Sequence, residues 1–376
     1  MINLEKTYKN LCTVNLDNLV HNYRHTVEIS GKKVICVIKA DAYGHGAVRC
    51  AKELEKAGCD MFAVSSCDEA LQLKEGGIVT SDILILGRIL PFELESAIEH
   101  GFILAAGSEG FIQSIIELKC KAKARLHIKL NTGMNRTGFD TIHGGEYPEL
   151  TRVLTLIKAN KELIDVEGVF SHFARAEDSA DFTNIQFDNF NRAVAFMEKN
   201  GITPKIKHIC NSAGTVGYRN MNLDAVRLGI YLYGCESSDS SYLPGMSLQS
   251  TVLEIHRLHK GDGVSYGLDF VCDKDMTIAV IGIGYADGLH RCLSNGKGYF
   301  LYKSVKCPIV GRICMDMTMI DISAVENPSV FDRVTVFGDG ESGFISCQEQ
   351  AENAGTISYE LLCSVSKRVS RVYTGN

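Results

Sequence analysis

Short runs of apolar, often β-branched residues alternate with amphipathic segments from Val34 to about Ile230. The amphipathic segments, such as residues 47–58 and 67–77, have apolar positions at helical spacing and end at glycine. This alternation is typical of a parallel sheet with crossover helices. It predicts strands at residues 34–39, 62–66, 83–87, 103–107, 125–130, 166–172, 206–211 and 225–230. Eight such units favour a (β/α)8 TIM barrel over an open doubly wound sheet, because no G-x-G-x-x-G turn follows a strand.

The pattern changes beyond Met246 to short strand-like runs punctuated by glycine and aspartate. Such runs predict a mainly antiparallel β domain, joined to the barrel by a linker at residues 235–245. We therefore expect a barrel domain at residues 12–240 and a C-terminal β domain at residues 241–376. Residues 1–11 precede the barrel and are expected to pair with the β domain.

Composition narrows the class of protein. Of the 376 residues, 45% are hydrophobic and 22% are charged, with a formal net charge of -6. The acidic balance argues against nucleic acid or an anionic membrane as a partner, and no apolar run is long enough to span a bilayer. Unless the sequence is a piece of a longer chain, the absence of a signal-peptide pattern predicts a cytoplasmic location. The 14 scattered cysteines show neither C-x-x-C nor zinc-like spacing, which predicts reduced thiols and no metal site.

Polar residues gather at or near the carboxyl ends of the predicted strands, where barrel enzymes place their chemistry. Lys39 closes the first strand, Lys129 lies in the fifth, His172 ends the sixth and Arg227 lies in the eighth. The loops after the seventh and eighth strands read NSAG and LGI, and their small residues offer free N–H groups at the usual phosphate site of this fold. Taken alone, Lys39 either reaches solvent or is a desolvated amine that forms a Schiff base.

Nine motifs stand in order along nearly the whole chain: IKADAYGHG (38–46), KLNTGMNRTGF (129–139), FSHFA (170–174), HICNSAGT (208–215), VRLGIYLYG (226–234), VSYG (264–267), IGYADG (283–288), GRICMDM (311–317) and ISYE (357–360). With these motifs the chain resembles the alanine racemases, pyridoxal-phosphate enzymes that have an N-terminal barrel and a C-terminal β domain. The resemblance implies interconversion of L- and D-alanine, supply of D-alanine for peptidoglycan, and a homodimer with shared active sites.

The resemblance implies that Lys39 carries pyridoxal phosphate as a Schiff base and that Arg227 faces the pyridine nitrogen. Because arginine stays protonated and only donates, a second positive charge on that nitrogen is disfavoured. The ring then withdraws electrons less strongly, so reprotonation of the substrate is expected to prevail over side reactions. The other cofactor-binding residues implied by the resemblance are Tyr43, Arg136, His172, Asn211, Ser212, Gly229, Ile230 and Tyr359.

Racemisation removes a proton from one face of Cα and returns one to the other. The resemblance assigns these faces to Lys39 and to Tyr266 of the neighbouring subunit, whereas a tyrosine at a strand start is otherwise most often an interfacial or packing residue. Lowering the phenol pKa of about 10 by about three units requires roughly 4 kcal/mol of preferential phenolate stabilisation. One surface ion pair, worth about 0–1 kcal/mol, does not supply that. The family's hydrogen-bonded set, matched here by His172, His208 and Arg227, is the kind of source required, although either histidine alone is equally consistent with a structural role.

Arg136 matches the residue near the cofactor's phenolic oxygen, which also contributes to substrate binding. Lys129 matches a lysine that is carbamylated in many relatives, and the alternative is a plain interior lysine paired with a carboxylate. Asn131 stands where many relatives have aspartate. One fewer negative charge nearby makes carbamylation of Lys129 easier to accommodate.

The β domain is expected to supply the substrate-binding loop and the gate. By resemblance, Met315, supported by Asp316, presents its backbone N–H to the substrate carboxylate, and Tyr285 and Tyr359 form a narrow inner gate. A bulky Tyr359 favours a methyl group over a longer side chain. The residues that match the family's outer entrance are Glu177, Arg291, Arg312 and Ile357.

Other functions compete with an alanine racemase. A serine or broad-specificity racemase of the same family stays open. Tyr266 and the CMD motif argue against a decarboxylase with the same two-domain plan. The β domain argues against a non-catalytic cofactor carrier, and the phosphate site with Arg227 argues against a cofactor-free Schiff-base aldolase.

Overall fold

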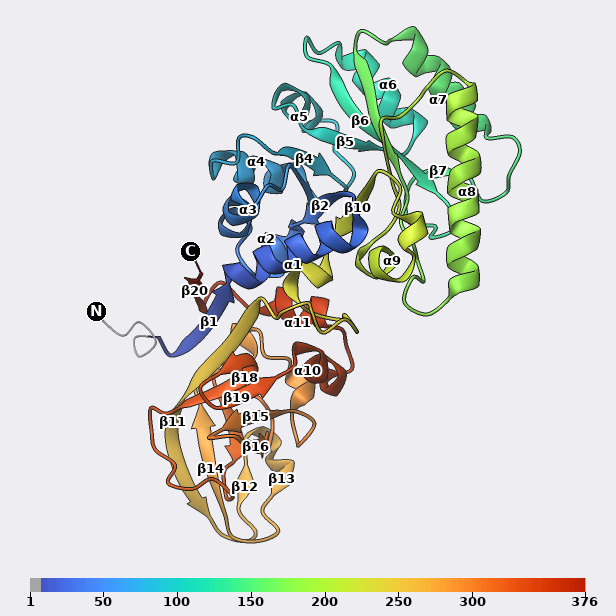
Figure 1. Ribbon diagram of the computed structural model, residues 1–376. Helices are drawn as coiled ribbons and strands as arrows, with labels where there is room; N and C mark the ends of the chain where they lie inside the picture. Colours follow the sequence, from blue (N-terminus) through green and yellow to red (C-terminus); the bar gives the residue numbers. More distant parts are fainter. Residues whose placement is uncertain (1–7, 376) are drawn as a thin grey trace. The chain divides into compact units, whose positions relative to one another are not determined.

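The computed structural model describes residues 8–375, which form two compact units (Figure 1). The barrel unit comprises Asn22–Ala42 and Ala47–Leu232. The β unit comprises the described residues up to His21, Tyr43–Gly46 and the chain from Tyr233 onward. Residues 1–7 of the segment expected to join the β domain lie outside the described residues.

Eight parallel strands form the sheet of the barrel unit, in the order β10-β2-β3-β4-β5-β6-β8-β9. The two ends of this order are joined by backbone hydrogen bonds from Asp224 N–H to Lys207 O (3.1 Å) and from Arg227 N–H to Cys210 O (3.0 Å). The sheet is therefore closed, which confirms the predicted TIM barrel. The strands are β2 (Lys33–Val37), β3 (Met61–Val64), β4 (Asp82–Ile85), β5 (Ile103–Ala106), β6 (Ala124–Asn131), β8 (Ile164–Phe170), β9 (Ile206–His208) and β10 (Ala225–Leu228), with β7 (Phe139–Asp140) beside β6.

All eight predicted strands are present, but seven of them end one to three residues earlier than the sequence predicts, and only β6 runs further, to Asn131. β2 ends at Val37, β8 at Phe170 and β9 at His208. Lys39, His172 and Asn211 therefore stand in the connections beyond their strands. The apolar pattern continues into these connections because their apolar residues are still buried, which the pattern cannot distinguish from strand.

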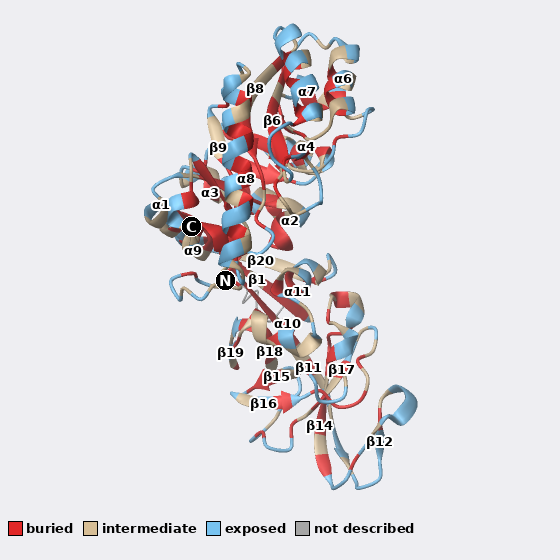
Figure 2. Cartoon of the chain, turned by 90° about the vertical axis from the view of Figure 1, so that its right-hand side faces the viewer, coloured by how far each residue is buried: buried red, intermediate tan, exposed pale blue. Residues whose placement is uncertain are grey.

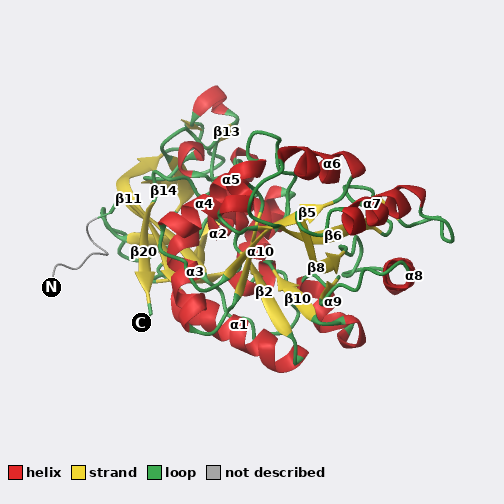
Figure 3. Ribbon diagram, turned by 90° about the horizontal axis from the view of Figure 1, so that it is seen from above, coloured by secondary structure: helices red, strands yellow, loops and turns green. Residues whose placement is uncertain are grey.

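Helices lie outside the strands of this unit, as the view from above shows (Figure 3). Three of them begin at a serine whose hydroxyl accepts an N–H of the first turn: Ser66, Ser108 and Ser179. β6 is buried along nearly its whole length, whereas the helices carry exposed outer faces (Figure 2). The helices are α3 (Ala47–Lys56), α4 (Cys67–Glu75), α5 (Leu94–Glu99), α6 (Glu109–Leu118), α7 (Pro148–Ala159), α8 (Ala180–Lys199) and α9 (Ser212–Gly217), with α1 (Leu16–Ser30) leading in from the β unit. No helix in the described part of the chain is both long and apolar enough to cross a membrane.

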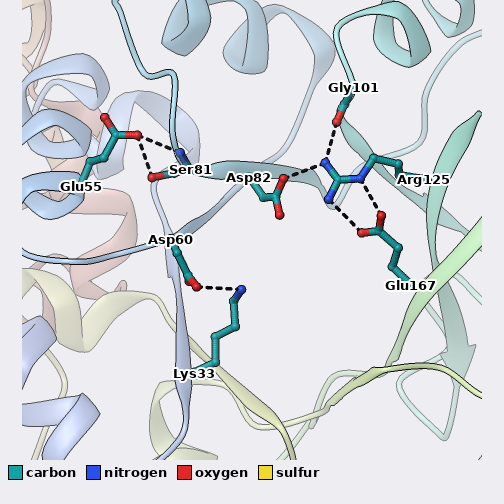
Figure 4. Close-up of polar contacts among 8 residues, drawn as sticks. All are labelled: Lys33, Glu55, Asp60, Ser81, Asp82, Gly101, Arg125 and Glu167. Carbon is teal, nitrogen blue, oxygen red and sulfur yellow. Dashed lines mark hydrogen bonds and ion pairs between the residues drawn. The ribbon is translucent and has the colours of Figure 1, made fainter. Parts of the chain in front are cut away.

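Ion pairs tie the strands together at their amino ends, away from the predicted chemistry (Figure 4). Arg125 donates to Asp82 at 2.7 Å and to Glu167 at 2.7 Å, which links β6 to β4 and β8. Its pKa is raised by the hydrogen bond to Asp82 and then by Glu167. The Lys33–Asp60 pair, at 3.1 Å, adds β2 to this belt. The segments 33–82 and 125–167 are thus linked at this end of the barrel by charged side chains that stay accessible to water.

The β unit is built on a mainly antiparallel sheet, as predicted, in the order β16-β15-β18-β11-β1-β20. Its amino-terminal strand β1 (Asn10–Asn15) pairs antiparallel with β11 (Met246–Leu258) and parallel with β20 (Ser370–Thr374). The remaining elements are β12 (Gly263–Val264), β13 (Phe270–Val271), β14 (Met276–Ile281), β15 (Tyr299–Tyr302), β16 (Val305–Pro308), β17 (Thr318–Asp321), β18 (Arg333–Gly340), β19 (Gly343–Ile345), α10 (Cys347–Ala354) and α11 (Ser358–Ser364). A buried cluster of Val264, Cys272, Met276, Ile278 and Val310 anchors the β12–β13 ribbon to this unit.

Candidate active site

Lys39 begins a left-handed turn directly beyond β2. The four residues after it have positive φ angles: Ala40 (52°), Asp41 (54°), Ala42 (55°) and Tyr43 (51°). Left-handed geometry costs a non-glycine residue roughly 1–2 kcal/mol, so four in succession persist only where surrounding contacts impose them. Strain of this kind is concentrated at functional sites, and here it adjoins the predicted catalytic lysine.

Arg227 in β10 organises the polar interior at the carboxyl end of the barrel. The residue is only 3% exposed, and its Nη2 donates to the carbonyls of Ser171 (2.7 Å) and Ile209 (2.9 Å). It also contacts two imidazoles, with Nη1 2.8 Å from His208 Nδ1 and Nη2 3.1 Å from His172 Nδ1. Because a guanidinium only donates, both Nδ1 atoms accept, and the proton of each neutral imidazole is assigned to Nε2.

Electrostatics keeps both histidines neutral. Burial lowers the pKa of His172 and of His208 well below its ordinary value, and the positive charge of Arg227 lowers both further. The structure therefore brings together the predicted set of His172, His208 and Arg227 as one fixed charge and two neutral donors.

His127 extends this set and is not among the residues that the sequence predicts. Its Nδ1 lies 2.9 Å from His208 Nε2, so it accepts the proton assigned to that nitrogen. Burial lowers the pKa of His127 to about 3. One sequence signal pointed to His127, because it stands two residues before Lys129 and therefore on the same face of β6. Its partner His208, however, is 81 residues away in the chain.

Lys129 lies in the same interior, with its Nζ 4.6 Å from the centre of the Phe170 ring. Burial lowers its pKa to about 7, assisted by the charges of Arg227, Arg136 and Lys39. The charged groups that shift its pKa include no carboxylate among residues 8–375, and whether Lys129 is carbamylated or a plain interior lysine stays a prediction. Asn131 instead accepts the N–H of Asn135 at 2.9 Å and shapes the loop that leads to the exposed Arg136.

The loops after β9 and β10 are joined by a hydroxyl. Ser212 is buried, and its Oγ accepts the N–H of Gly229 at 2.9 Å. Asn211 precedes it as the cap of α9 and accepts the N–H of Gly214 at 2.9 Å. The structure thus places the predicted residues Ser212 and Gly229 in direct contact and Asn211 next to them, with Ile230 following in the chain.

This interior fits an anionic cofactor. Besides burial, the main causes that lower the pKa of His172 are the positive charges of Arg227, Lys129, Arg136 and Lys39. Such a concentration of positive charge, with N–H and O–H donors beside it, suits a phosphate and a phenolate oxygen. Pyridoxal phosphate carries both groups and an aldehyde that a lysine amine can take up.

Tyr43 and Tyr359 lie in the β unit, where their rings are 5.7 Å apart. Tyr43 is buried, its ring lies 4.8 Å from that of Tyr233, and burial raises its pKa. The two tyrosines that the resemblance assigns to the phosphate are therefore neighbours. The turn after Tyr43 packs closely, since a Cβ on Gly46 would lie 2.0 Å from Tyr373 Oη.

The loop at Met315 is fixed by the short helix η5 (Tyr285–Asp287). Tyr285 N–H donates to Cys314 O and Ala286 N–H to Met315 O, both at 3.0 Å. Arg368 also contacts the loop and donates to Asp316 at 2.7 Å. The predicted residues Tyr285, Met315 and Asp316 are therefore parts of one arrangement.

Tyr266 stands in η4 (Tyr266–Leu268) and is 70% exposed. Exposed apolar side chains accompany it in the same unit: Leu268, Val271, Met315 and Met317. Of the predicted outer-entrance residues, Glu177 is in the barrel unit, whereas Arg291, Arg312 and Ile357 are in the β unit. Their shared role stays a prediction.

Comparisons with known proteins agree with this architecture. The sequence matches the family described as alanine racemase, N-terminal domain, over residues 14–237 and alanine racemase, C-terminal domain, over residues 245–373. It is 37% identical over 383 residues to alanine racemase 2 of Oceanobacillus iheyensis, with 98% of this chain and 95% of the relative covered.

Solved structures give the same result. Alanine racemase of Clostridium difficile 630 superposes with a TM-score of 0.89 at 36% identity, covering 98% of this chain and 96% of that chain. Alanine racemase of Bartonella henselae, solved with covalently bound pyridoxal phosphate, has a TM-score of 0.87 at 28% identity, covering 98% and 100%.

Proposed function

The chain belongs to the alanine racemase family, and from this premise we propose that it interconverts L- and D-alanine with Lys39 and Tyr266 as the two bases. Its enzyme class is that of an alanine racemase, dependent on pyridoxal phosphate. The observation that carries the residue assignment is the interior around Arg227, whose guanidinium is hydrogen-bonded to the two neutral histidines His172 and His208.

The proposed roles in cofactor binding follow from the donors present. Lys39 holds the cofactor covalently, Ser212, Gly229 and Ile230 bind its phosphate together with Tyr43 and Tyr359, and Arg227 faces the ring nitrogen. When bound, the cofactor withdraws electrons from the substrate and makes its Cα proton acidic. Because Arg227 is held by carbonyls and imidazoles that only accept from it, it remains a donor and keeps the ring nitrogen unprotonated.

The proton movements belong to two side chains. Lys39 Nζ takes or returns the proton on one face of Cα, and Tyr266 Oη serves the other face. A phenolate needs roughly 4 kcal/mol of preferential stabilisation to be present near neutral pH. His172, whose Nε2 proton is fixed by Arg227, is a neutral donor suited to that oxygen, with a buried positive charge behind it. Arg136 and the Met315 N–H are proposed to bind the substrate carboxylate.

Lys129 is proposed to be carbamylated. Carbon dioxide reacts with a neutral amine, and a pKa of about 7 leaves a large neutral fraction near neutral pH. The carbamate would place a negative charge among Arg136, Arg227 and Lys39. Carbon-13 bicarbonate should give a carbamate NMR signal in the wild type that is missing in Lys129→Arg.

Assembly and location complete the proposal. A homodimer in which Tyr266 serves the neighbouring subunit is supported by the exposure of Tyr266 and of apolar side chains such as Leu268 and Met315 in the same unit. A cytoplasmic location is supported by the 14 cysteines, none of which forms a disulfide in the described structure. Supply of D-alanine for peptidoglycan is the role that the family implies.

Solvent deuterium exchange at Cα across a panel of L- and D-amino acids tests the chemistry and the substrate together. Exchange should be fastest with the two enantiomers of alanine and should vanish in Lys39→Ala, along with the borohydride-sensitive visible absorbance. Faster exchange with serine would favour the alternative of a serine or broad-specificity racemase. Retained absorbance in Lys39→Ala would show that another lysine carries the cofactor.

A further inference from the structure

The strained turn after Lys39 is held at its first amide by a carboxylate from the next strand–helix unit. Ala40 N–H donates to Glu69 Oε1 at 2.7 Å, and Ser65 N–H donates to Oε2 of the same carboxylate at 2.7 Å. Glu69 lies in the first turn of α4, where its own N–H is bonded to the capping Ser66. A carboxylate at this helix position ordinarily turns back to the cap residue, whereas here it joins the connections that follow β2 and β3.

The amides on both sides of Lys39 are therefore fixed. Ile38 N–H donates to Ala63 O at 2.9 Å, which continues the pairing of β2 with β3. Ala40 N–H, the first in the left-handed segment, is taken by Glu69. The backbone of Lys39 thus passes from sheet to left-handed turn between two tertiary hydrogen bonds.

We propose that Glu69 is a positioning residue for Lys39. Its carboxylate imposes the left-handed geometry at Ala40 and thereby sets the direction from which Lys39 presents Nζ. Without it, the turn relaxes toward right-handed or extended geometry, and Nζ loses its alignment with the atoms that it must bond and deprotonate. This inference rests on the proposed function of Lys39 as cofactor carrier and base.

Glu55 offers a matched control. Its carboxylate accepts the N–H groups of Thr80 (3.1 Å) and Ser81 (2.9 Å) and the Ser81 hydroxyl (2.8 Å), so it also holds a loop through backbone amides. That loop precedes β4 at the amino end of the barrel (Figure 4). Removing either carboxylate removes comparable bonds, but only Glu69 adjoins Lys39.

The test compares Glu69→Ala, Glu69→Gln, Glu55→Ala and Glu55→Gln as holoenzymes. The readouts are the visible absorbance of the lysine-bound cofactor, its loss on dialysis, kcat, KM and Tm. Glu69→Ala should release the cofactor faster and lower kcat on the order of 10- to 100-fold, the range expected for a misplaced reacting group. Glu69→Gln keeps one acceptor and should lie between Glu69→Ala and the wild type. Both Glu55 variants should lower Tm to a similar extent, with absorbance and kcat unchanged.

Wild-type absorbance and kcat in folded Glu69→Ala would overturn the proposal, as would equal losses in the Glu55 variants. If Glu69→Ala does not fold, Glu69→Gln decides by the same criterion. Lys39→Ala separates the two levels of inference. If it keeps a borohydride-sensitive absorbance, the proposed function fails, whereas if it loses that absorbance and the Glu69 variants keep theirs, only the positioning role fails.

Discussion

In the barrel interior, the protonation state of each titratable side chain is set by its neighbours. Arg227 donates to Nδ1 of His172 and of His208, so the proton assigned to each imidazole lies on Nε2. His208 Nε2 in turn donates to His127 Nδ1. None of these contacts joins residues adjacent in sequence. The chemistry of the site is therefore a property of contacts made by folding rather than of any one motif.

Lys129 makes this dependence measurable in the cofactor-free protein. Its folded pKa of about 7 lies below the unfolded value of about 10.4. Between these two pH values the unfolded chain binds more protons than the folded chain, so the free energy of unfolding rises with pH from about 7 to about 10.4. Below about pH 7 the folded protein bears the full cost of burying the charged amine. This cost of burying the charge amounts to a few kcal/mol. Denaturant titrations of wild type and Lys129→Met, with carbon dioxide removed, should converge as pH rises through this window, and a constant gap would contradict the assigned shift.

Tyr359 bears on substrate choice at the same scale. Its ring lies beside Tyr43 in the β unit and is half-buried. Tyr359→Ala or Tyr359→Asn should raise kcat/KM for serine relative to alanine, by roughly the 10-fold expected where a pocket gains room for one group. If the ratio of kcat/KM for the two substrates stays unchanged, Tyr359 plays no part in specificity.

At the scale of helices, strands and loops, close contact between backbones positions the site residues, and Gly284 is one example. A Cβ at this position would lie 2.3 Å from Met315 O, so η5 and the Met315 loop touch backbone to backbone. Gly284→Ala should push the loop away and raise KM for alanine about 10-fold or more, because misplaced binding groups lose affinity steeply. Gly110→Ala is the control, since nothing lies within 4 Å of its added Cβ in α6. Steady-state kinetics with an unchanged KM in Gly284→Ala would show that the loop does not depend on this contact.

The sequence predicts elements better than it predicts how they end. The eight barrel strands follow from apolar runs because each run is buried in the closed sheet. The turn at Lys39 does not follow, because its left-handed geometry depends on Glu69 and Asp41, which accept the N–H groups of Ala40 and Ala47. A local pattern carries no information about the acceptor that a distant side chain supplies.

Candidate residues divide in the same way. Lys39, Arg227 and Ser212 stand near the carboxyl ends of strands, where the fold rules place chemistry. His127 was not predicted because its importance depends on His208 in another strand. The motifs assigned Tyr266 and Met315 through resemblance alone. Nothing in local periodicity distinguishes these exposed side chains from ordinary surface residues.

At the scale of the whole molecule, racemisation needs bases on opposite faces of one planar carbon. Lys39 belongs to the barrel unit and Tyr266 to the β unit. The proposed assembly is a two-fold dimer, in which one interface is repeated on both subunits. Each dimer then contains two composite sites, and each site uses one base from each chain.

Mixing two inactive variants tests this arrangement directly. In a heterodimer of Lys39→Ala and Tyr266→Ala, one site contains both substitutions and the other contains neither. Co-expressed and co-purified heterodimers should therefore regain activity, up to half that of the wild type, because one of two sites is intact. Each homodimeric variant serves as the control for residual activity. If verified heterodimers stay as inactive as their parents, the bases of each site come from a single chain, and the exposure of Tyr266 requires another explanation.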